Sequence, residues 1–274
     1  MALADDYDGF LIDLDGVVWV GRDLIPKAAE TLRELAERDR SFVFVTNNPG
    51  RPASVYAGRL REAGIDVGEE RIVTAGESTA RLAAQIADPG EGAFVIGTEA
   101  FRDAVAAEGL DVLEGEAAGA AAIVVVSGHR GFDYDELLTA TLALQGGAKL
   151  VATSRDPTLP MPGGAWPGTG AVLAAIETAS GATAEIGGKP ERRLFELACE
   201  RLGDARRVAM VGDRIASDIE GGRRAGLGTI LVLSGATAPE EAGTPGIADH
   251  VVEDLSGLLG SPITPGDVAL PSDR

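Results

Sequence analysis

The stretch from Phe10 to Val18, which reads FLIDLDGVV, constrains the fold more than any other part of the chain. Apolar residues flank Asp13 before Asp15-Gly16 ends the run, a pattern typical of a buried strand that ends in two carboxylates and a turn. Open α/β sheets bind their ligands outside the carboxyl ends of such strands. Because side chains alternate along a strand, we expect the two carboxylates to point into one small volume.

Two carboxylates in one small volume repel each other. At a separation of about 4 Å the repulsion is roughly 4 kcal/mol if the effective dielectric constant is about 20. A hard divalent cation with oxygen ligands offsets this repulsion most simply. The alternative is that an Asp at a strand end forms a turn or caps the next helix, which explains Asp15 but not Asp13 inside the apolar run.

The composition restricts the compartment and the partners. The chain has 274 residues, 45% of them hydrophobic, and a single cysteine, Cys199, so it cannot form an intramolecular disulfide. No signal peptide and no membrane-spanning apolar run is visible, so we expect a soluble, cytoplasmic protein. A net charge of −19 argues against nucleic acid and anionic membrane surfaces as partners.

Strands and helices alternate in the first 75 residues. After the first strand we expect a helix from Pro26 to Glu37, a strand Ser41–Thr46, a helix from Pro52 to Gly64 and a strand Arg71–Thr74. This βαβαβ order predicts a doubly wound parallel sheet. A second βαβ pattern follows residue 186: a helix Pro190–Leu202, a strand Arg207–Val211, a helix Ala216–Ala225 and strands Thr229–Leu233 and His250–Val252.

A separate segment interrupts this pattern. It contains predicted helices Ser78–Ile86, Glu99–Glu108, Phe132–Leu144 and Thr169–Ser180 and predicted strands Phe94–Gly97, Ala122–Ser127 and Lys149–Thr153. The proline-rich stretch Ser154–Gly168 is too irregular for a helix or a central strand. We therefore expect an α/β fold with a Rossmann-like core at 1–75 plus 186–260, an inserted α/β domain at 76–185 and a flexible C-terminal tail at 261–274.

Two more carboxylates are expected at the edge of the sheet that holds Asp13 and Asp15. The segment Arg207–Asp213 repeats the pattern of an apolar strand that ends in an acid, and Asp218 falls in the first turns of the next helix. Four carboxylates at one edge would be strongly self-repelling on their own. They suit a Mg²⁺ site, because this ion takes a few carboxylates and bridges to phosphate.

A phosphate that faces four acids also needs a cation and neutral donors. Lys189 supplies a point charge of the kind that binds phosphate, and Thr46 and Asn47 lie at the end of the strand Ser41–Thr46. Taken singly, Lys189 could be a solvated loop residue and the other two could be ordinary turn residues.

Four short motifs, in this order, resemble those of the haloacid dehalogenase-like superfamily of phosphatases. They are D-x-D-G-V at 13–17, T-N-N at 46–48, G-K-P at 188–190 and G-D-R-x-x-x-D-I-x-G at 212–221. The insert, with its TSRDPTLPMPGG and PGTGA stretches, is similar to the C2-type cap of subfamily IIA, which contains NagD-like nucleotidases, phosphoglycolate phosphatases and 4-nitrophenylphosphatases. The resemblance covers about residues 8–259.

The resemblance implies a role for each motif residue. Asp13 would be the nucleophile that forms an aspartyl-phosphate, and Asp15 would protonate the leaving alcohol and then activate water. Asp13, the backbone carbonyl of Asp15, Asp213 and Asp218 would form the Mg²⁺ site. Thr46 and Asn47 would hold phosphoryl oxygens, and Lys189 would neutralise charge between the nucleophile and the phosphate.

The insert would choose the substrate and, by the same resemblance, form a homodimer through the cap. Candidate substrate contacts are His129, Arg130, Arg155, Asp156 and Trp166. An arginine that binds a substrate carboxylate would suit phosphoglycolate, and Trp166 stacked on a base would suit a nucleotide. Glycerol phosphate and sugar phosphates also stay open.

Two other functions compete with a phosphatase. A phospho-acceptor module of the receiver type also gathers acids, Thr and Lys at strand ends, but its adjacent acid pair is absent here and it has no place for the insert. A catalytically silent relative that acts as a binding or regulatory protein is the other alternative. The apparently complete set of motif residues argues against it.

Overall fold

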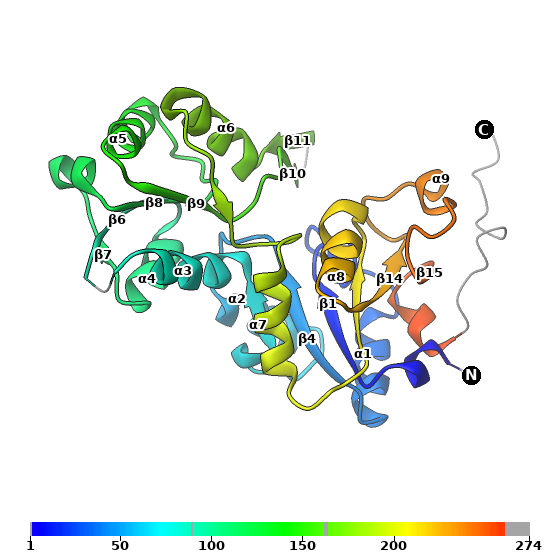
Figure 1. The fold of residues 1–274 in the computed structure, drawn as a ribbon. Helices are drawn as coiled ribbons and strands as arrows, with labels where there is room; N and C mark the ends of the chain where they lie inside the picture. The colour runs from blue at the N-terminus through cyan, green and yellow to red at the C-terminus, as the bar shows by residue number, and fades with distance from the viewer. Residues whose placement is uncertain (1, 89, 162–163, 261–274) are drawn as a thin grey trace. The chain divides into compact units, whose positions relative to one another are not determined.

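A computed structural model of the protein describes residues 2–88, 90–161 and 164–260. The expected tail at 261–274 lies outside these residues. The chain forms two compact units (Figure 1). Unit 1 takes the residues up to Thr46, Ala53–Val73 and the residues from Lys189 onward, and unit 2 takes Asn47–Pro52 and Thr74–Gly188.

Unit 1 is built on a six-stranded sheet with the order β15-β14-β13-β1-β4-β5. Strand β1 lies between β13 and β4 and runs parallel to both, with Gly9 opposite Val208 on one side and Ser41 on the other. The strands are β1 (Gly9–Asp13), β4 (Ser41–Thr46), β5 (Ile72–Thr74), β13 (Val208–Gly212), β14 (Gly228–Val232) and β15 (His250–Val252). This parallel, doubly wound arrangement confirms the predicted fold class.

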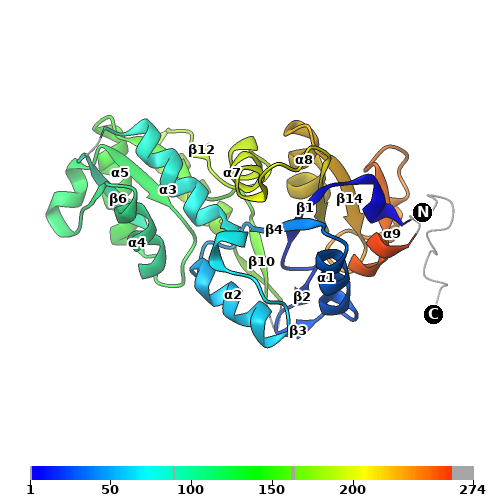
Figure 2. The same ribbon diagram turned by 90° about the horizontal axis from the view of Figure 1, so that it is seen from below.

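Helices cover both faces of this sheet. Figure 2 shows α1 and α2 on one side of β1 and β4, and α7 and α8 on the other. On the first side, Phe10 and Ile12 of β1 belong to one apolar cluster with Leu32 and Leu35 of α1. The helices of unit 1 are η1 (Leu3–Asp6), α1 (Ala28–Glu37), α2 (Ala53–Glu62), η2 (Glu69–Arg71), α7 (Arg192–Leu202), η4 (Ile215–Ile219), α8 (Glu220–Arg224), α9 (Pro239–Ala242) and η5 (Leu255–Leu259).

Unit 2 is built on a five-stranded sheet with the order β12-β9-β8-β6-β7, and all four neighbouring pairs are parallel. Its strands are β6 (Gly92–Ile96), β7 (Asp111–Val112), β8 (Ile123–Val126), β9 (Lys149–Ala152) and β12 (Glu185–Ile186). Its helices are α3 (Ala75–Ile86), α4 (Glu99–Ala107), η3 (Gly115–Ala120), α5 (Tyr134–Gln145) and α6 (Thr169–Ser180).

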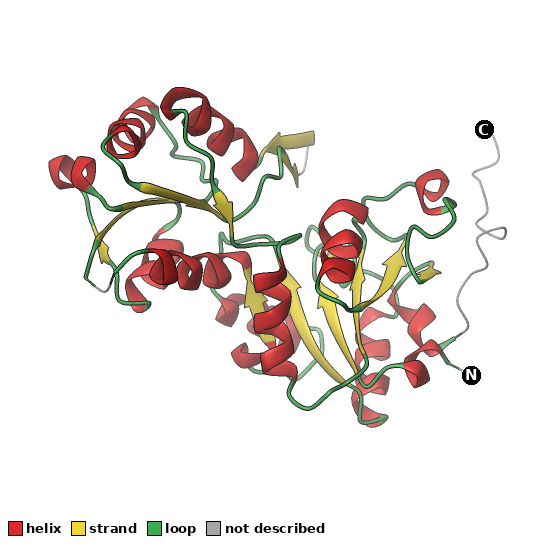
Figure 3. Ribbon diagram, in the orientation of Figure 1, coloured by secondary structure: helices red, strands yellow, loops and turns green. Residues whose placement is uncertain are grey.

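The side-chain alternation of β8 explains why unit 2 also has helices on both faces. Val124 and Val126 join the apolar cluster of α5 and α6, whereas Ile123 and Val125 join the cluster of α3 and α4. Figure 3 shows these two pairs of helices on opposite sides of the sheet. No helix in the described part of the chain has the length and apolar character needed to cross a membrane.

Two segments contain local structure that the sequence did not predict. Ser154–Gly168 contributes no strand to either central sheet among the described residues, as expected, but it contains a two-stranded antiparallel hairpin, β10 (Thr158–Met161) and β11 (Gly164–Pro167), because prolines are tolerated in strands outside a central sheet. The predicted helix Ala216–Ala225 begins instead as a π-helical turn, η4, and continues as the short helix α8. Apolar spacing does not distinguish a π-helical turn from an α-helical one.

Candidate active site

The carboxyl ends of three neighbouring strands of unit 1 carry polar side chains. Asp13 is the last residue of β1, Thr46 is the last residue of β4, and Asp213 directly follows β13. Because β1 lies between β13 and β4 and is parallel to both, these ends meet at one edge of the sheet. All three residues are buried.

A buried lysine joins this edge from the segment before α7. The Nζ atom of Lys189 lies 2.7 Å from Asp13 Oδ1 and 2.7 Å from Asp218 Oδ1. The three residues are only 3%, 6% and 0% exposed, respectively. The fold therefore brings together a nucleophile candidate, a cation and a carboxylate. Their pairing makes the burial of these charges tolerable, because an unpaired buried charge would strongly destabilise the fold.

Three carboxylates lie close enough to hold one metal ion. Asp13, Asp213 and Asp218 each offer an oxygen, and these oxygens lie within 4.8 Å of one another. Asp213 Oδ2 accepts a hydrogen bond of 2.6 Å from the Ala236 N–H, but its Oδ1 is buried without a hydrogen-bond partner among the described residues. An all-oxygen set with an unpartnered buried oxygen fits Mg²⁺, which prefers such ligands.

The electrostatics of the cluster favour the binding of a cation. Burial, followed by repulsion from Asp218, raises the pKa of Asp213 to about 6. Burial also raises the pKa of Asp13, although the charge of Lys189 opposes the rise. Burial disfavours the charged form of Lys189, but the carboxylates of Asp13 and Asp218 outweigh this effect and raise its pKa. One ammonium does not balance three carboxylates, so a bound cation would relieve the remaining repulsion.

Asp15 occupies a different environment from Asp13. Strand β1 ends at Asp13, so the expected alternation does not continue to Asp15, whose side chain is exposed and accepts a hydrogen bond of 3.0 Å from Trp19 Nε1. Among the described residues it is not part of the group of three carboxylates. Loss of hydration near the protein surface raises the pKa of Asp15, while the Trp19 hydrogen bond and the charges of Arg59 and Lys189 oppose the rise.

A loop after β14 completes the site and was missed by the sequence reasoning. The Ser234 hydroxyl donates to the Gly16 carbonyl at 2.7 Å, and a Cβ atom on either Gly16 or Gly235 would lie within 2.3 Å of Asp213 Oδ2. Gly16 also has a φ of 91°, which favours glycine. The available signal was the run of small residues in LSGAT directly after an apolar strand, at the same edge of the sheet.

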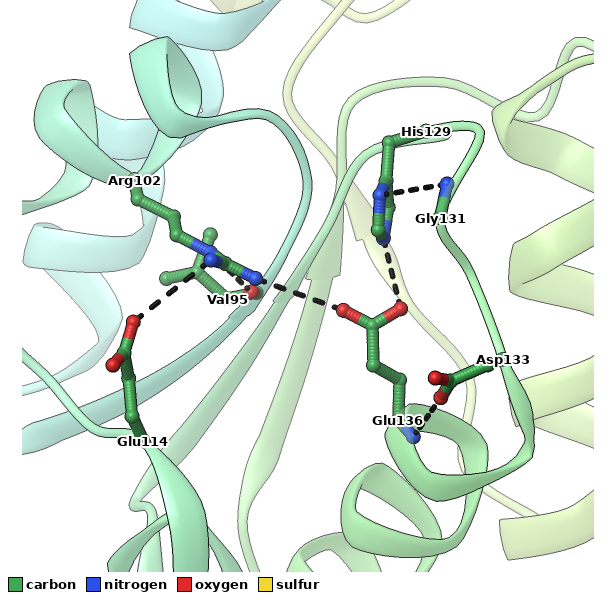
Figure 4. Close-up of polar contacts among 7 residues, drawn as sticks. All are labelled: Val95, Arg102, Glu114, His129, Gly131, Asp133 and Glu136. Atoms are coloured by element: carbon green, nitrogen blue, oxygen red, sulfur yellow. Dashed lines mark hydrogen bonds and ion pairs between the residues drawn. The ribbon is translucent and has the colours of Figure 1, made fainter.

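His129 lies in unit 2 and is held in a polar network. Figure 4 shows its Nε2 beside Glu136 Oε2, at 2.8 Å, and the Gly131 N–H donating to its Nδ1 at 3.3 Å. Glu136 in turn lies 3.6 Å from Arg102, which also lies 3.8 Å from Glu114. The contact with the Gly131 N–H favours the tautomer in which Nε2 donates to Glu136.

The other candidates of unit 2 form separate contacts. The Arg130 guanidinium lies 4.3 Å from the centre of the Trp166 ring, a cation–π geometry. Asn47 Nδ2 donates to Asp156 Oδ2 at 3.1 Å. Arg155 donates two hydrogen bonds of 2.9 Å to Glu177, whose pKa is lowered chiefly by them. The sequence did not predict any of these pairings.

Known proteins resemble the chain over nearly its whole length. A family model described as haloacid dehalogenase-like hydrolase matches residues 10–111, and a second, described as HAD-hydrolase-like, matches residues 186–258. The D-glycerol 3-phosphate phosphatase of Mycobacterium tuberculosis is 39% identical over 88% of this chain and 67% of its own length. The 5'-nucleotidase YutF of Bacillus subtilis is 36% identical over 91% of this chain and 92% of its own.

A solved structure shares the fold as well as the sequence. The crystal structure of a glycerol phosphate phosphatase from Mycobacterium tuberculosis in complex with magnesium has a TM-score of 0.88 and 35% identity. The match covers 94% of this chain and 78% of that one.

Proposed function

Because the chain belongs to the haloacid dehalogenase-like hydrolases, we propose that it cleaves a small phosphate ester with Asp13 as the nucleophile. The family membership confirms the resemblance drawn from the motifs. Its activity is that of a Mg²⁺-dependent phosphatase, as the names of its relatives and the magnesium complex of one of them support. The single observation that carries the assignment of Asp13 is its buried contact with Lys189 beside two further carboxylates.

The proposed chemistry divides the work among these side chains. Asp13, Asp213, Asp218 and the backbone carbonyl of Asp15 are proposed to hold Mg²⁺. The bound ion would reduce the repulsion between the negatively charged phosphate and these carboxylates. Asp13 attacks phosphorus to give an aspartyl-phosphate, and Lys189 favours the ionised form of the attacking carboxylate and offsets charge on the transferred group.

Three further roles complete the proposed reaction. Asp15 gives a proton to the leaving oxygen and then accepts one from the water that hydrolyses the aspartyl-phosphate. Thr46 and Asn47 are proposed to donate hydrogen bonds to phosphoryl oxygens. The proposal for these two rests on their place at the end of β4 and on the motif that they form.

We further propose that residues 76–185 act as a cap that selects the substrate through His129, Arg130, Arg155, Asp156 and Trp166. Glycerol phosphate, a nucleoside monophosphate, phosphoglycolate and a sugar phosphate are the substrate classes to compare. The single cysteine and the acidic composition support a cytoplasmic protein that does not bind nucleic acid or membranes. A homodimer through the cap is proposed on the family resemblance and is tested by light scattering of the purified protein.

The phosphatase activity is tested with p-nitrophenyl phosphate and Mg²⁺. We expect the wild type to release nitrophenol, Asp13→Asn to abolish release while it leaves the fold intact by circular dichroism, and EDTA to abolish release as well. Asp66→Asn, which removes an acid whose side chain is 98% exposed, is the matched control and should leave the rate unchanged. Wild-type activity no higher than that of Asp13→Asn would favour a silent relative. If the wild type is active, a panel of the four substrate classes identifies its substrate.

A further inference from the structure

The proposed acid, Asp15, is held by a buried tryptophan that no part of the proposed function uses. Trp19, the first residue of the short hairpin strand β2 (Trp19–Val20), is 0% exposed, and its indole N–H donates to Asp15 Oδ1 at 3.0 Å. β2 pairs with β3 (Asp23–Leu24), so the tryptophan also belongs to a hydrogen-bonded hairpin. The hydrogen bond thus ties an exposed carboxylate to a fully buried side chain of unit 1.

Two side chains of α2 fix the plane of the indole. The Tyr56 ring is stacked on that of Trp19, with an interplanar angle of 7° and 6.5 Å between centres. The Arg59 guanidinium lies 3.8 Å from the ring centre, and its Nη2 donates to the Gly21 carbonyl at 2.8 Å. Stacking and cation–π contacts of this kind restrict the ring to one orientation.

The backbone fixes the two partners as well. The Leu14 carbonyl accepts hydrogen bonds from Val18 N and Trp19 N at 2.9 and 3.2 Å, and Gly16 N donates to the Trp19 carbonyl at 2.7 Å. Asp15 and Trp19 also form an isolated bridge. The position of the indole N–H relative to Asp15 is therefore set by the turn and not by the side chains alone.

We propose that Trp19 is a positioning residue that holds Asp15 by Oδ1 and thereby assigns the transferable proton to Oδ2. The inference rests on the proposed role of Asp15 as the general acid. An indole N–H only donates, so Oδ1 has to be the accepting oxygen whether Asp15 is ionised or neutral. Because the indole N–H occupies Oδ1, the proton is carried on the other oxygen, Oδ2.

The reaction uses this proton in one defined step. An oxygen lone pair of Asp13 forms a bond to phosphorus while the ester P–O bond breaks, and the electron pair of that bond goes to the leaving oxygen. The leaving oxygen takes the proton from Asp15 Oδ2 and departs as an alcohol. Water then attacks phosphorus, gives a proton back to Asp15 and releases Asp13 and inorganic phosphate.

A purely structural reading of Trp19 predicts a different result. A buried indole usually needs an acceptor, and Asp15 could serve only to satisfy it. Loss of the indole would then lower the activity toward every substrate equally. If Trp19 positions the proton, its loss affects an alkoxide leaving group, which needs the proton, far more than p-nitrophenolate, which leaves without one.

The decisive measurement is kcat/KM of Trp19→Phe for the alkyl phosphate that the substrate panel identifies and for p-nitrophenyl phosphate. This constant reports only the steps up to departure of the alcohol, so hydrolysis of the aspartyl-phosphate does not enter it. We expect the ratio of the two constants to fall about tenfold, the effect of losing one hydrogen bond to a charged group. Phe42→Leu, which also removes a buried aromatic ring of unit 1, should lower both constants by the same factor and is the matched control.

A second variant covers the case in which Trp19→Phe does not fold. Replacing the indole of Trp19 by its benzothiophene isostere keeps the shape and removes only the N–H donor, so the same fall in the ratio is expected. An equal fall for both substrates, or an unchanged ratio, would overturn the positioning role. If the wild type hydrolyses neither p-nitrophenyl phosphate nor any of the four substrate classes, the proposed function is rejected, and the positioning role is rejected with it.

The hydrogen bond itself has a spectroscopic signature that does not depend on activity. The chain has two tryptophans, and Trp166→Phe identifies which indole N–H resonance belongs to Trp19. We expect Asp15→Ala to move the Trp19 proton resonance upfield and to leave that of Trp166 in place. An unmoved Trp19 resonance would show that the N–H does not bond to Asp15 in solution, and it would refute the inference even in an active enzyme.

Discussion

Removing the charge of Asp213 should stabilise the metal-free protein although it destroys the metal site. Burial and the neighbouring Asp218 raise the pKa of Asp213 from 3.8 to about 6. The folded state therefore binds a proton at Asp213 more tightly than the unfolded state does. The resulting gain in the free energy of unfolding is fully present below pH 3.8 and is lost as the pH rises through about 6. At about 1.36 kcal/mol for each unit of pKa, the ionised Asp213 costs about 3 kcal/mol at pH 7.5.

Asp213→Asn keeps the shape and an acceptor oxygen for the Ala236 N–H, which lies 2.6 Å from the carboxylate. In EDTA at pH 7.5 we expect the free energy of unfolding, measured with urea, to exceed that of the wild type by up to about 3 kcal/mol. The difference should shrink below about 1 kcal/mol at pH 4, where the wild-type carboxyl is largely protonated.

Added Mg²⁺ should reverse the order of the two proteins. A ligand that binds only the folded state stabilises it by about 4.1 kcal/mol at a thousand times its Kd, which exceeds the cost of about 3 kcal/mol in EDTA, and the variant loses this gain with its ligand oxygen. Asp66→Asn removes the same unit of charge from a side chain that is 98% exposed and should leave the stability in EDTA unchanged. A less stable Asp213→Asn in EDTA, or one that Mg²⁺ stabilises as much as the wild type, would refute the reasoning.

Three further results are expected. Lys189→Met leaves buried carboxylates without their ammonium, so it should remove the phosphatase activity and lower the free energy of unfolding by about 3 to 5 kcal/mol, as urea titration would reveal. Gly16→Ala forces a Cβ atom to 2.3 Å from Asp213 Oδ2 at a φ of 91°, so calorimetry should find weaker Mg²⁺ binding. Arg207 lowers the pKa of Asp8 to about 2, so the stability difference between the wild type and Arg207→Ala should be present above pH 4 and disappear as the pH falls to 2.

The sequence predicted the charged edge of the sheet because its signals are local. An apolar run that ends in an acid marks both Asp13 and Asp213, and parallel topology then brings the two strand ends together. The same reasoning was wrong about the surroundings of Asp15, because alternation holds only inside a strand and β1 ends at Asp13.

Contacts between distant segments could not be predicted in this way. Nothing in the sequence pairs Arg155 with Glu177 or places Gly235 against Asp213, since these contacts depend on how loops close. Trp19 was likewise invisible as a partner of Asp15, because a tryptophan four residues after an acid has no fixed direction until the intervening turn is known.

The order of the strands has a consequence for how the protein folds. β1 pairs on one side with β13, about 200 residues later, and Lys189 reaches Asp13 across 176 positions. Closing so large a loop costs entropy before any contact repays it, so such pairings form slowly. During synthesis, the sheet of unit 2 has all its strands once residue 186 has emerged, whereas that of unit 1 must wait for residues 208–252. The cluster of Asp13, Lys189, Asp213 and Asp218 is therefore among the last parts of the chain to assemble, and a truncated nascent chain would leave the central strand β1 with an open edge.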